Sequence, residues 1–263
     1  MKCRLCGSES LTLLYTQGNR DEFRFYRCAA CRLVNADMEA GLDQEKYALE
    51  YVDPFDDRVK SNRAQTITHG FLKRHMPHTG RMLEIGCGNG RLMYLAMQDG
   101  WRVRGLELSP FLARSVKERL GIDVEVADFL SYRVREDDRY DLVLLRHVLE
   151  HLPDSAGAMR SIHALLNDGG YALLEFPNID ALDIRFKRWL RKTGLHRRRY
   201  PEGYKPGHCN EFCRAAFEHL LRQTGFDLVV WETYSYRPIS NWIFNRWHVG
   251  NKVRTIIRKA AGP

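Results

Sequence analysis

The chain has 263 residues, of which 44% are hydrophobic and 28% charged, as in a globular protein with one large domain and a smaller one. Its formal net charge of +8 favours an anionic partner: a phosphorylated small molecule, nucleic acid or an anionic membrane surface. We find no N-terminal apolar segment and no run of about 18 apolar residues, so we expect a cytoplasmic protein that is neither secreted nor membrane-spanning.

Two cysteine pairs stand near the N-terminus. Cys3 and Cys6 form one C-x-x-C motif, and Cys28 and Cys31 form a second one after 21 intervening residues. In a reducing compartment such pairs indicate metal ligands rather than disulfides. The spacing predicts a four-cysteine zinc site in a zinc-ribbon-like unit over residues 1–38, and four protein thiolates make that zinc structural. A redox C-x-x-C pair, the alternative, lacks the βαβ context that it needs.

A helical linker is expected over residues 39–79. An acidic stretch comes first, and an amphipathic helix is predicted at Arg58–His75. The apolar positions near one face of this helix are Val59, Ile67, Phe71 and Leu72.

From residue 80 onward, short apolar runs alternate with helical patterns. Strands are predicted at Met82–Ile85, Val103–Leu108, Val124–Ala127, Tyr140–Leu145 and Tyr171–Phe176. The intervening helices are predicted at Arg91–Gln98, at Pro110–Leu120 and from Asp154 to a stop at residues 167–170. This alternation predicts an α/β fold over residues 80–237, with a doubly wound, Rossmann-like and mostly parallel sheet. Ligands bind beyond the carboxyl ends of such strands.

A glycine-rich turn follows the first of these strands. Gly86, Gly88 and Gly90 stand at alternating positions directly before a helix. Glycines allow positive φ and a close approach of a ligand to the main chain, and the helix start supplies N–H donors, which suits a nucleotide-like cofactor. A nicotinamide cofactor would require G-x-G-x-x-G, but Arg91 stands at the third position.

Acidic residues stand at or near the ends of the predicted strands. Glu107 is placed to accept hydrogen bonds from two ribose hydroxyls, and Asp128 to accept one from an adenine amino group, with Phe129 against the ring. Glu84 lies inside an apolar strand, where an unpaired carboxylate would be costly. Its presence is explained if backbone N–H groups or a cationic ligand satisfy it.

The ordered motifs LEIGCGNG, GLELS, ADF and YDLVLLRHVLEHLPD, followed by DGGYALLEFPN, resemble those of class I S-adenosylmethionine-dependent methyltransferases over roughly residues 80–235. The resemblance implies S-adenosylmethionine as cofactor, with its methionine part held by the glycine turn. It implies cofactor contacts at Glu84, Gly86, Cys87, Gly88, Glu107, Leu108, Asp128, Phe129 and Arg146.

The segment after the fourth strand carries the candidate catalytic residues. His147, Glu150 and His151 have i, i+3, i+4 spacing, which one helical turn would place on a single face. They could bind a divalent metal, supply a histidine base, or brace the loop. His208, expected at the pocket mouth, is a second base candidate. Methyl transfer needs no covalent nucleophile, so the remaining cysteines are interpreted as packing or loop residues: Cys87, Cys209 and Cys213.

A basic insertion is expected at residues 179–207, with Arg197–Arg199 as its densest cluster. It could cap the acceptor pocket and hold a diphosphate, lie on an anionic membrane, bind RNA, or be a solvated loop. We favour phosphate contact at Arg197–Arg199. The basic, aromatic tail at 238–263 could finish the sheet, cap the core or touch a membrane.

These features predict a methyltransferase with a structural zinc that acts on a small, phosphorylated metabolite, such as a nucleotide-linked sugar or a polysaccharide precursor. Bacterial sugar methyltransferases with Cys-rich N-terminal units are similar in layout. An RNA methyltransferase is the alternative, although no Asn-Pro-Pro-Tyr-type motif follows the fourth strand. A cofactor-binding protein without turnover is a further alternative, and the oligomeric state is left open.

Overall fold

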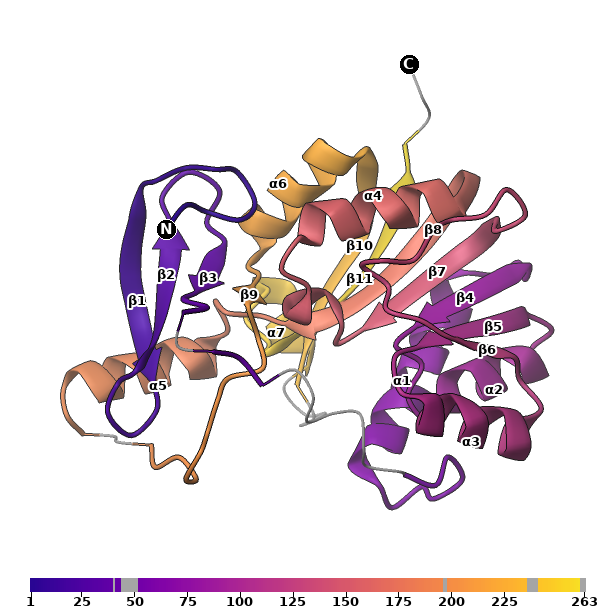
Figure 1. Ribbon diagram of the computed structural model, residues 1–263, viewed down its shortest axis with the longest axis horizontal. Coiled ribbons are helices and arrows are strands. Elements are labelled where there is room, and N and C mark those ends of the chain that lie inside the picture. Colours follow the sequence, from indigo (N-terminus) through magenta and orange to yellow (C-terminus); the bar gives the residue numbers. More distant parts are fainter. Residues whose placement is uncertain (40, 44–51, 196–197, 236–240, 261–263) are drawn as a thin grey trace. The chain divides into compact units, whose positions relative to one another are not determined.

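The computed structural model describes residues 1–39, 41–43, 52–195, 198–235 and 241–260 (Figure 1). The chain forms two compact units. Unit 1 comprises Met1–Gln44, His147–Arg160 and Leu174–Ile257, and unit 2 comprises Glu45–Arg146, Ser161–Leu173 and Arg258–Pro263. The domain boundaries at residues 38, 79 and 237 stay a prediction. Within the ranges that the structure describes, no helix is long and apolar enough to cross a membrane.

Unit 2 contains the parallel strands that carry the glycine turn. Its strands are β4 (Arg81–Ile85), β5 (Arg102–Glu107), β6 (Val124–Val126) and β7 (Tyr140–Arg146). β4 pairs in parallel with β5 and β7, and β5 pairs in parallel with β6. The complete sheet has seven strands in the order β10-β11-β8-β7-β4-β5-β6. The predicted α/β, doubly wound fold is therefore confirmed.

Three helices accompany these strands (Figure 1): α1 (Lys60–His75), α2 (Arg91–Gln98) and α3 (Pro110–Leu120). The ends of α3 follow from local sequence. The side chain of Ser109 accepts a hydrogen bond from the Leu112 N–H, and Pro110 occupies the first turn. Gly121 ends the helix with φ 70°, a conformation in which a residue with a Cβ is strained.

Helix α1 buries only part of the predicted apolar face. Phe71 and Leu72 are buried as expected, but Ile67 is 52% exposed, so that part of the prediction is wrong. The polar residues Asn62 and Gln65 are buried instead. They take part in hydrogen bonds with the loop before α2, which offset the cost of burying them.

Three elements belong partly to each unit: α4 (Ser155–Leu165), β8 (Leu166–Pro177) and β11 (Lys252–Lys259). β8 begins at Leu166, where a helix end was predicted, and not at Tyr171. The Asn167 side chain donates to Asp141 Oδ1 at 2.8 Å, and Gly169 adopts φ 70°. The Gly-Gly pair is therefore accommodated within the strand rather than at a helix terminus.

Unit 1 contains a second, antiparallel sheet with the order β1-β2-β3-β9. Its strands are β1 (Leu11–Gln17), β2 (Phe23–Cys28), β3 (Val34–Ala36) and β9 (Asn210–Glu211). The N-terminal cysteine unit thus pairs with residues that follow the basic insertion, a pairing that the sequence does not indicate.

The remaining elements are η1 (Leu149–His151), α5 (Leu182–Lys192), α6 (Arg214–Thr224), β10 (Phe226–Tyr234), α7 (Asn241–Trp247) and β11 (Lys252–Lys259). Helix α5 forms the first part of the predicted basic insertion and lies beside the β1–β2 hairpin in Figure 1. β11 lies between β10 and β8. Of the three roles considered for the tail, residues 252–259 therefore complete the sheet.

Candidate functional site

The turn after β4 has the conformation that its glycines predict. Gly86 and Gly88 have φ values of 69° and 56°, and Gly90 has 74°. A Cβ on Gly88 would meet nothing within 4 Å, whereas one on Gly90 would lie 2.9 Å from the Val116 side chain. Gly90 is therefore required for packing against α3. Gly88 borders open space, where a ligand can approach the main chain.

The carboxylate of Glu107 is fixed at the end of β5. Its Oε2 accepts a hydrogen bond from the Gly88 N–H at 2.9 Å, and its Oε1 accepts one from the Ser109 N–H at 3.1 Å. The residue is 9% exposed. Each carboxylate oxygen can accept more than one hydrogen bond. Glu107 is therefore held in one position and can still accept bonds from the hydroxyls of a ligand.

Three predicted cofactor contacts follow β5 and β6, and two of them, Asp128 and Phe129, were predicted for the adenine part. Leu108 is 62% exposed directly after Glu107, so its side chain can contact a ring. Asp128 is exposed, and its Oδ1 accepts a hydrogen bond from the Leu130 N–H at 3.0 Å. Phe129 is only 6% exposed, so most of its ring belongs to the core.

The other predicted cofactor residues also lie in unit 2. Glu84 is 1% exposed in β4, between β5 and β7. Cys87 is 4% exposed, and burial raises the pKa of its thiol well above its usual value. That environment agrees with a packing role for the cysteine. Arg146 is the last residue of β7 and is half-buried.

Helix α1 holds the loop before α2 through polar contacts that sequence reasoning missed. The amide of Gln65 donates to Asn89 Oδ1 at 3.1 Å and accepts from the Leu92 N–H at 3.1 Å. Asn89 in turn donates to Asn62 Oδ1 at 2.8 Å. Arg91 is 9% exposed and donates to the Thr66 hydroxyl at 2.9 Å. These side chains fix the turn, but nothing in their spacing identifies them.

Unit 1 brings three of the four predicted catalytic residues together. The ligand atoms of Glu150, His151 and His208 lie within 4.8 Å of one another. The His151 and His208 rings meet edge to face, with centroids 4.9 Å apart. Glu150 is 1% exposed, and its buried Oε2 has no hydrogen-bond partner among the residues that the structure describes. These three side chains could bind a metal ion, or could accept and donate a proton.

His147 lies outside this cluster, and the single helical face predicted for it is wrong. The helix is the short η1, and His147 precedes it in a left-handed conformation with φ 55°. Its Nδ1 is 3.2 Å from Glu150 Oε1, and its Nε2 is 3.0 Å from the Lys252 Nζ. Because an ammonium only donates, Nε2 is the acceptor and Nδ1 carries the proton that points to Glu150.

Two ionisable groups of the cluster have shifted pKa values. Burial lowers the pKa of His208 below its ordinary value, with the nearby Glu150 opposing the shift. Burial acts to raise the pKa of Glu150, but the hydrogen bond from His147 and the neighbouring histidines together lower it. Near neutral pH the cluster therefore combines a carboxylate with a neutral His208.

The four predicted zinc ligands converge. Cys3 Sγ lies 3.5 Å from Cys31 Sγ, and Cys6 Sγ lies 3.6 Å from Cys28 Sγ. Four sulfurs bound to one zinc ion at about 2.3 Å would be separated by roughly 3.8 Å. None of the chain's seven cysteines, all within the described ranges, forms a disulfide. The residues therefore fit a tetrahedral metal site.

The two cysteine turns share one geometry. The Gly7 N–H donates to the Cys3 carbonyl at 2.9 Å, and the Arg32 N–H donates to the Cys28 carbonyl at 3.1 Å. Gly7 and Arg32 have φ values of 71° and 69°. Arg32 thus adopts a conformation that glycine accepts without strain. A metal that ties both turns together would explain why a strained arginine is tolerated there.

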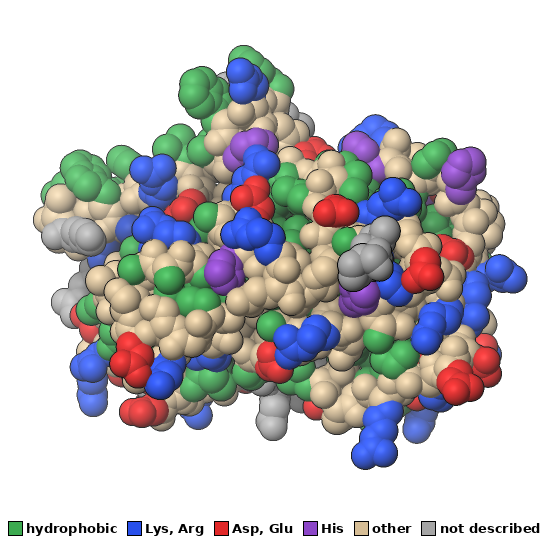
Figure 2. Space-filling view, turned by 90° about the horizontal axis from the view of Figure 1, so that it is seen from above, with side chains coloured by type: hydrophobic (Ala, Val, Ile, Leu, Met, Phe, Trp, Pro, Cys, Tyr) green, Lys and Arg blue, Asp and Glu red, His purple; other side chains and the backbone are tan. Residues whose placement is uncertain are grey.

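The basic insertion is only partly described. Arg197 lies outside the described residues. Arg198 lies over the Tyr200 ring, with its Cζ 5.1 Å from the ring centroid. On α5, Phe186 and Trp189 are 56% and 55% exposed. Figure 2 shows Lys and Arg side chains spread over the face in view, with Asp and Glu side chains between them. On that face the positive charge is not gathered into one continuous patch.

Known proteins that are similar to this chain include methyltransferases, the class that the glycine turn and the sheet indicate. The family model described as "Methyltransferase domain" matches residues 48–230. A ubiquinone biosynthesis O-methyltransferase of Nitrosospira multiformis is 26% identical over 226 residues, which are 79% of this chain and 88% of that protein. The protein of the same name from Burkholderia vietnamiensis is 24% identical over 220 residues, covering 79% and 90% of the two chains.

Solved structures share the fold at low identity. A Pyrococcus horikoshii protein has a TM-score of 0.60 and 16% identity, with 82% of this chain and 99% of that one covered. A glycopeptide N-methyltransferase in complex with sinefungin has a TM-score of 0.53 and 19% identity, with coverage of 75% and 87%. At such identities the likeness extends to the fold alone.

Proposed function

Because the chain belongs to the methyltransferase-domain family, we propose that it transfers the methyl group of S-adenosylmethionine to a hydroxyl oxygen of a small anionic acceptor. The family and the names of the relatives indicate an S-adenosylmethionine-dependent methyltransferase. Relatives named O-methyltransferases support oxygen as the receiving atom. The net charge of +8 supports an anionic acceptor.

Residues of unit 2 would hold the methyl donor. Glu107 would accept hydrogen bonds from two ribose hydroxyls, because main-chain N–H groups already fix both of its oxygens. Gly86 and Gly88 would let the methionine part approach the main chain. Leu108 would contact the adenine ring, and Asp128 its amino group. When bound, S-adenosylmethionine supplies a methyl group on a positively charged sulfur, so the protein needs no covalent nucleophile.

The observation that carries the proposal is the clamped position of His208. His151 Nδ1 donates to the Gly207 carbonyl at 2.8 Å, and the Cys209 N–H donates to the Glu150 carbonyl at 3.0 Å. The residues on both sides of His208 are therefore held. Its lowered pKa keeps the imidazole neutral near pH 7, where it can accept a proton. The Glu150 carboxylate would stabilise the imidazolium that forms.

In the proposed reaction, the acceptor hydroxyl gives its proton to a ring nitrogen of His208 while its oxygen bonds to the methyl carbon. The products would be a methyl ether and a neutral thioether, with the proton held on His208. His147 orients Glu150, and His151 braces the loop that bears His208. A divalent metal on Glu150, His151 and His208 is the alternative use of the same cluster.

A chelator separates the two uses of the cluster. We expect methyl transfer to continue after dialysis against a strong chelator and removal of the chelator, because His208 accepts the proton directly. Loss of turnover that Mg²⁺ or Mn²⁺ restores would favour the metal. Zinc in the four-cysteine site must be measured in the same sample, so that its loss is not mistaken for loss of a catalytic ion.

We also propose that Cys3, Cys6, Cys28 and Cys31 bind a structural zinc ion. The sulfur–sulfur distances and the matched cysteine turns support it. The hydrogen bond with Cys31 lowers the pKa of the Cys3 thiol below its usual value. With all four positions occupied by protein sulfurs, the ion would stabilise the sheet of unit 1 and take no part in methyl transfer.

The acceptor is proposed to be a phosphorylated metabolite, of which a nucleotide-linked sugar or a polysaccharide precursor is an example. RNA remains the second candidate, although the interspersed acidic side chains in Figure 2 do not favour it. An anionic membrane surface is a further candidate partner, because Phe186 and Trp189 are exposed on the basic helix α5. Incubation with labelled S-adenosylmethionine and separated small-molecule, RNA and lipid fractions tests all three.

A further inference from the structure

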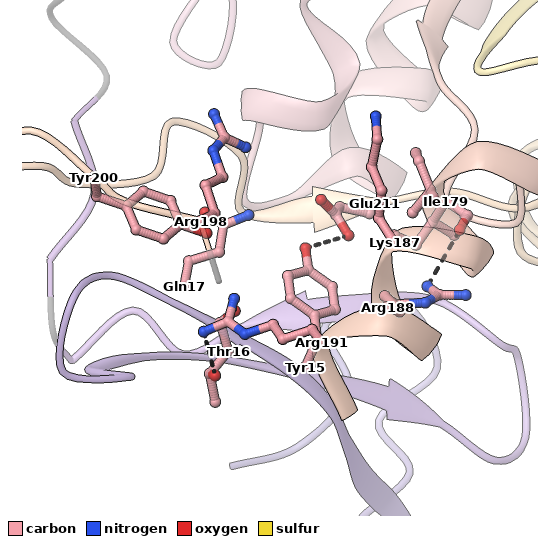
Figure 3. Close-up of a pocket in the computed structure, with 11 residues that line it drawn as sticks. Tyr15, Thr16, Gln17, Ile179, Lys187, Arg188, Arg191, Arg198, Tyr200 and Glu211 are labelled. Atoms are coloured by element: carbon pink, nitrogen blue, oxygen red, sulfur yellow. Dashed lines mark hydrogen bonds between the residues drawn. The ribbon is translucent and has the colours of Figure 1, made fainter. Parts of the chain in front are cut away.

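A pocket in unit 1 lies between strand β1 and helix α5 (Figure 3). It encloses about 250 Å³. β1 belongs to the cysteine-bearing sheet and α5 to the basic insertion, so the walls come from segments far apart in the sequence. No residue of this pocket was singled out as a ligand from the sequence apart from Arg198 in the arginine cluster.

Four cationic side chains line the pocket, and their charged ends point in different directions (Figure 3). Arg188, Arg191 and Arg198 all line the pocket, together with Lys187 (Figure 3). Arg191 is fixed by donating to the Thr16 carbonyl at 2.6 Å. Each guanidinium carries five N–H donors in a planar fork, the arrangement that suits phosphate oxygens.

Arg188 is the most enclosed of these cations. Its side chain is 17% exposed and donates to the Ile179 carbonyl at 3.2 Å. Its nearest carboxylate, that of Asp180, is 4.0 Å away and also pairs with Arg27. Burial, with the nearby Arg27 charge, lowers the pKa of Arg188. The guanidinium is therefore incompletely compensated by the protein, and an anion in the pocket would relieve that cost.

The pocket is preformed on a rigid support. Tyr15 stacks on Phe25 with centroids 4.5 Å apart. Asn19 and Tyr200 exchange two hydrogen bonds of 2.9 and 3.0 Å, which tie the insertion to the β1–β2 turn. The aromatic rings of Tyr15 and Tyr200 add an apolar surface beside the cations. Such a wall can contact an organic group attached to a phosphate as well as the phosphate itself.

Glu211 connects the pocket with the proposed base. Its Oε2 accepts a hydrogen bond from the Tyr15 hydroxyl at 2.7 Å, and its Oε1 lies 4.0 Å from His208 Nδ1. Burial raises the pKa of Glu211 to about 7. A molecule that occupies the pocket therefore lies one side chain away from His208.

We propose that this pocket binds the phosphate-ester end of the methyl acceptor, with Arg188, Arg191 and Arg198 on the phosphate oxygens. The inference rests on the proposed function and assigns its substrate class: a phosphate ester whose methylated hydroxyl lies at the other end, towards His208. Glu211 and Tyr15 would close the side of the pocket that faces the base.

Calorimetric titration of the full chain with a nucleoside diphosphate and with inorganic phosphate tests the inference. We expect the diphosphate to bind more tightly than inorganic phosphate, because the aromatic wall contacts its organic part. In Arg188→Gln its affinity should fall about tenfold or more, as expected for one charge-assisted phosphate contact. Arg185→Gln is the matched control, since Arg185 is exposed on the same helix and does not line the pocket, and its affinity should change less than about twofold.

Three results would overturn the inference. They are equal binding of the two probes, unchanged affinity in a folded Arg188→Gln variant, and tighter binding of single-stranded RNA than of the diphosphate. S-adenosylmethionine titration and methyl transfer are measured on the same samples. If a small acceptor is methylated but Arg188→Gln binds the diphosphate normally, the pocket assignment fails and the proposed function stands. If the diphosphate binds as expected but no small molecule is methylated, the proposed function fails.

Discussion

Replacing Glu107 by alanine should weaken S-adenosylmethionine binding about a hundredfold. The carboxylate sits at the end of β5 with one oxygen bonded to the Gly88 N–H and the other to the Ser109 N–H. In the proposed complex it also accepts hydrogen bonds from two ribose hydroxyls. A hydrogen bond to a charged group contributes at least about 1.5 kcal/mol, so two contribute about 3 kcal/mol, or roughly a factor of a hundred in Kd.

The measurement is calorimetric titration of S-adenosylmethionine into the wild type and the variant. Glu118→Ala is the control, because it removes the same charge from an exposed position on α3. Thermal unfolding must show that the variant folds, since the freed Gly88 and Ser109 N–H groups then depend on water. Unchanged affinity in a folded Glu107→Ala variant would refute the ribose assignment.

Three further outcomes follow from the site. His208→Ala should lower kcat by about 10²- to 10⁴-fold with little change in S-adenosylmethionine affinity, as for loss of a general base, and His151→Ala should have a smaller effect; full turnover without His208 would exclude it as the base. The proposed reaction requires neutral His208, whose pKa is lowered. As the pH is lowered, kcat/KM should therefore stay constant down to about pH 6.5, the ordinary histidine pKa, and fall only at lower pH. A kcat/KM that rises towards acid pH would contradict this. Elemental analysis should find one zinc per chain, and Cys28→Ser should lower both zinc content and thermal stability; protein without stoichiometric metal would exclude the site.

Features set by neighbours in sequence are the ones that the sequence predicts well. The glycine turn, the Ser109 cap and the Gly121 stop depend on backbone rules that act within a few residues. The fourth predicted strand, Tyr140–Leu145, has a near-continuous apolar run, which is typical of a central strand, and Leu142–Leu145 are fully buried. The convergence of two C-x-x-C motifs also follows from ligand geometry alone.

Features set by distant packing could not be predicted. Tyr15 and Glu211 are joined by a hydrogen bond across 196 positions, and neither has a motif of its own. Hydrophobic spacing groups Ile67 with Phe71 and Leu72, yet Ile67 is exposed, while the polar Gln65 is buried and contacts the loop at Asn89. His147 has helical spacing, yet its left-handed backbone and its contact with Lys252 remove it from the helix.

The helix termini also show where local signals compete. The Asp168-Gly169-Gly170 sequence is typical of a helix stop, but it lies inside β8. Leu166 and Leu165 are both fully buried, so the chain passes directly from helix to strand within the core. Burial of Leu165 and Leu166 therefore sets the boundary between α4 and β8, and Gly169 and Gly170 lie within the strand.

Methylation of a small phosphorylated molecule from S-adenosylmethionine is the central activity proposed for this chain. The most direct measurement is transfer of a labelled methyl group into a phosphate-bearing metabolite fraction, with treatment by phosphatase before the reaction as the control. We predict label in that fraction, and its loss both after phosphatase treatment and in His208→Ala. Label that appears only in RNA, or transfer that phosphatase treatment leaves unchanged, would contradict the account.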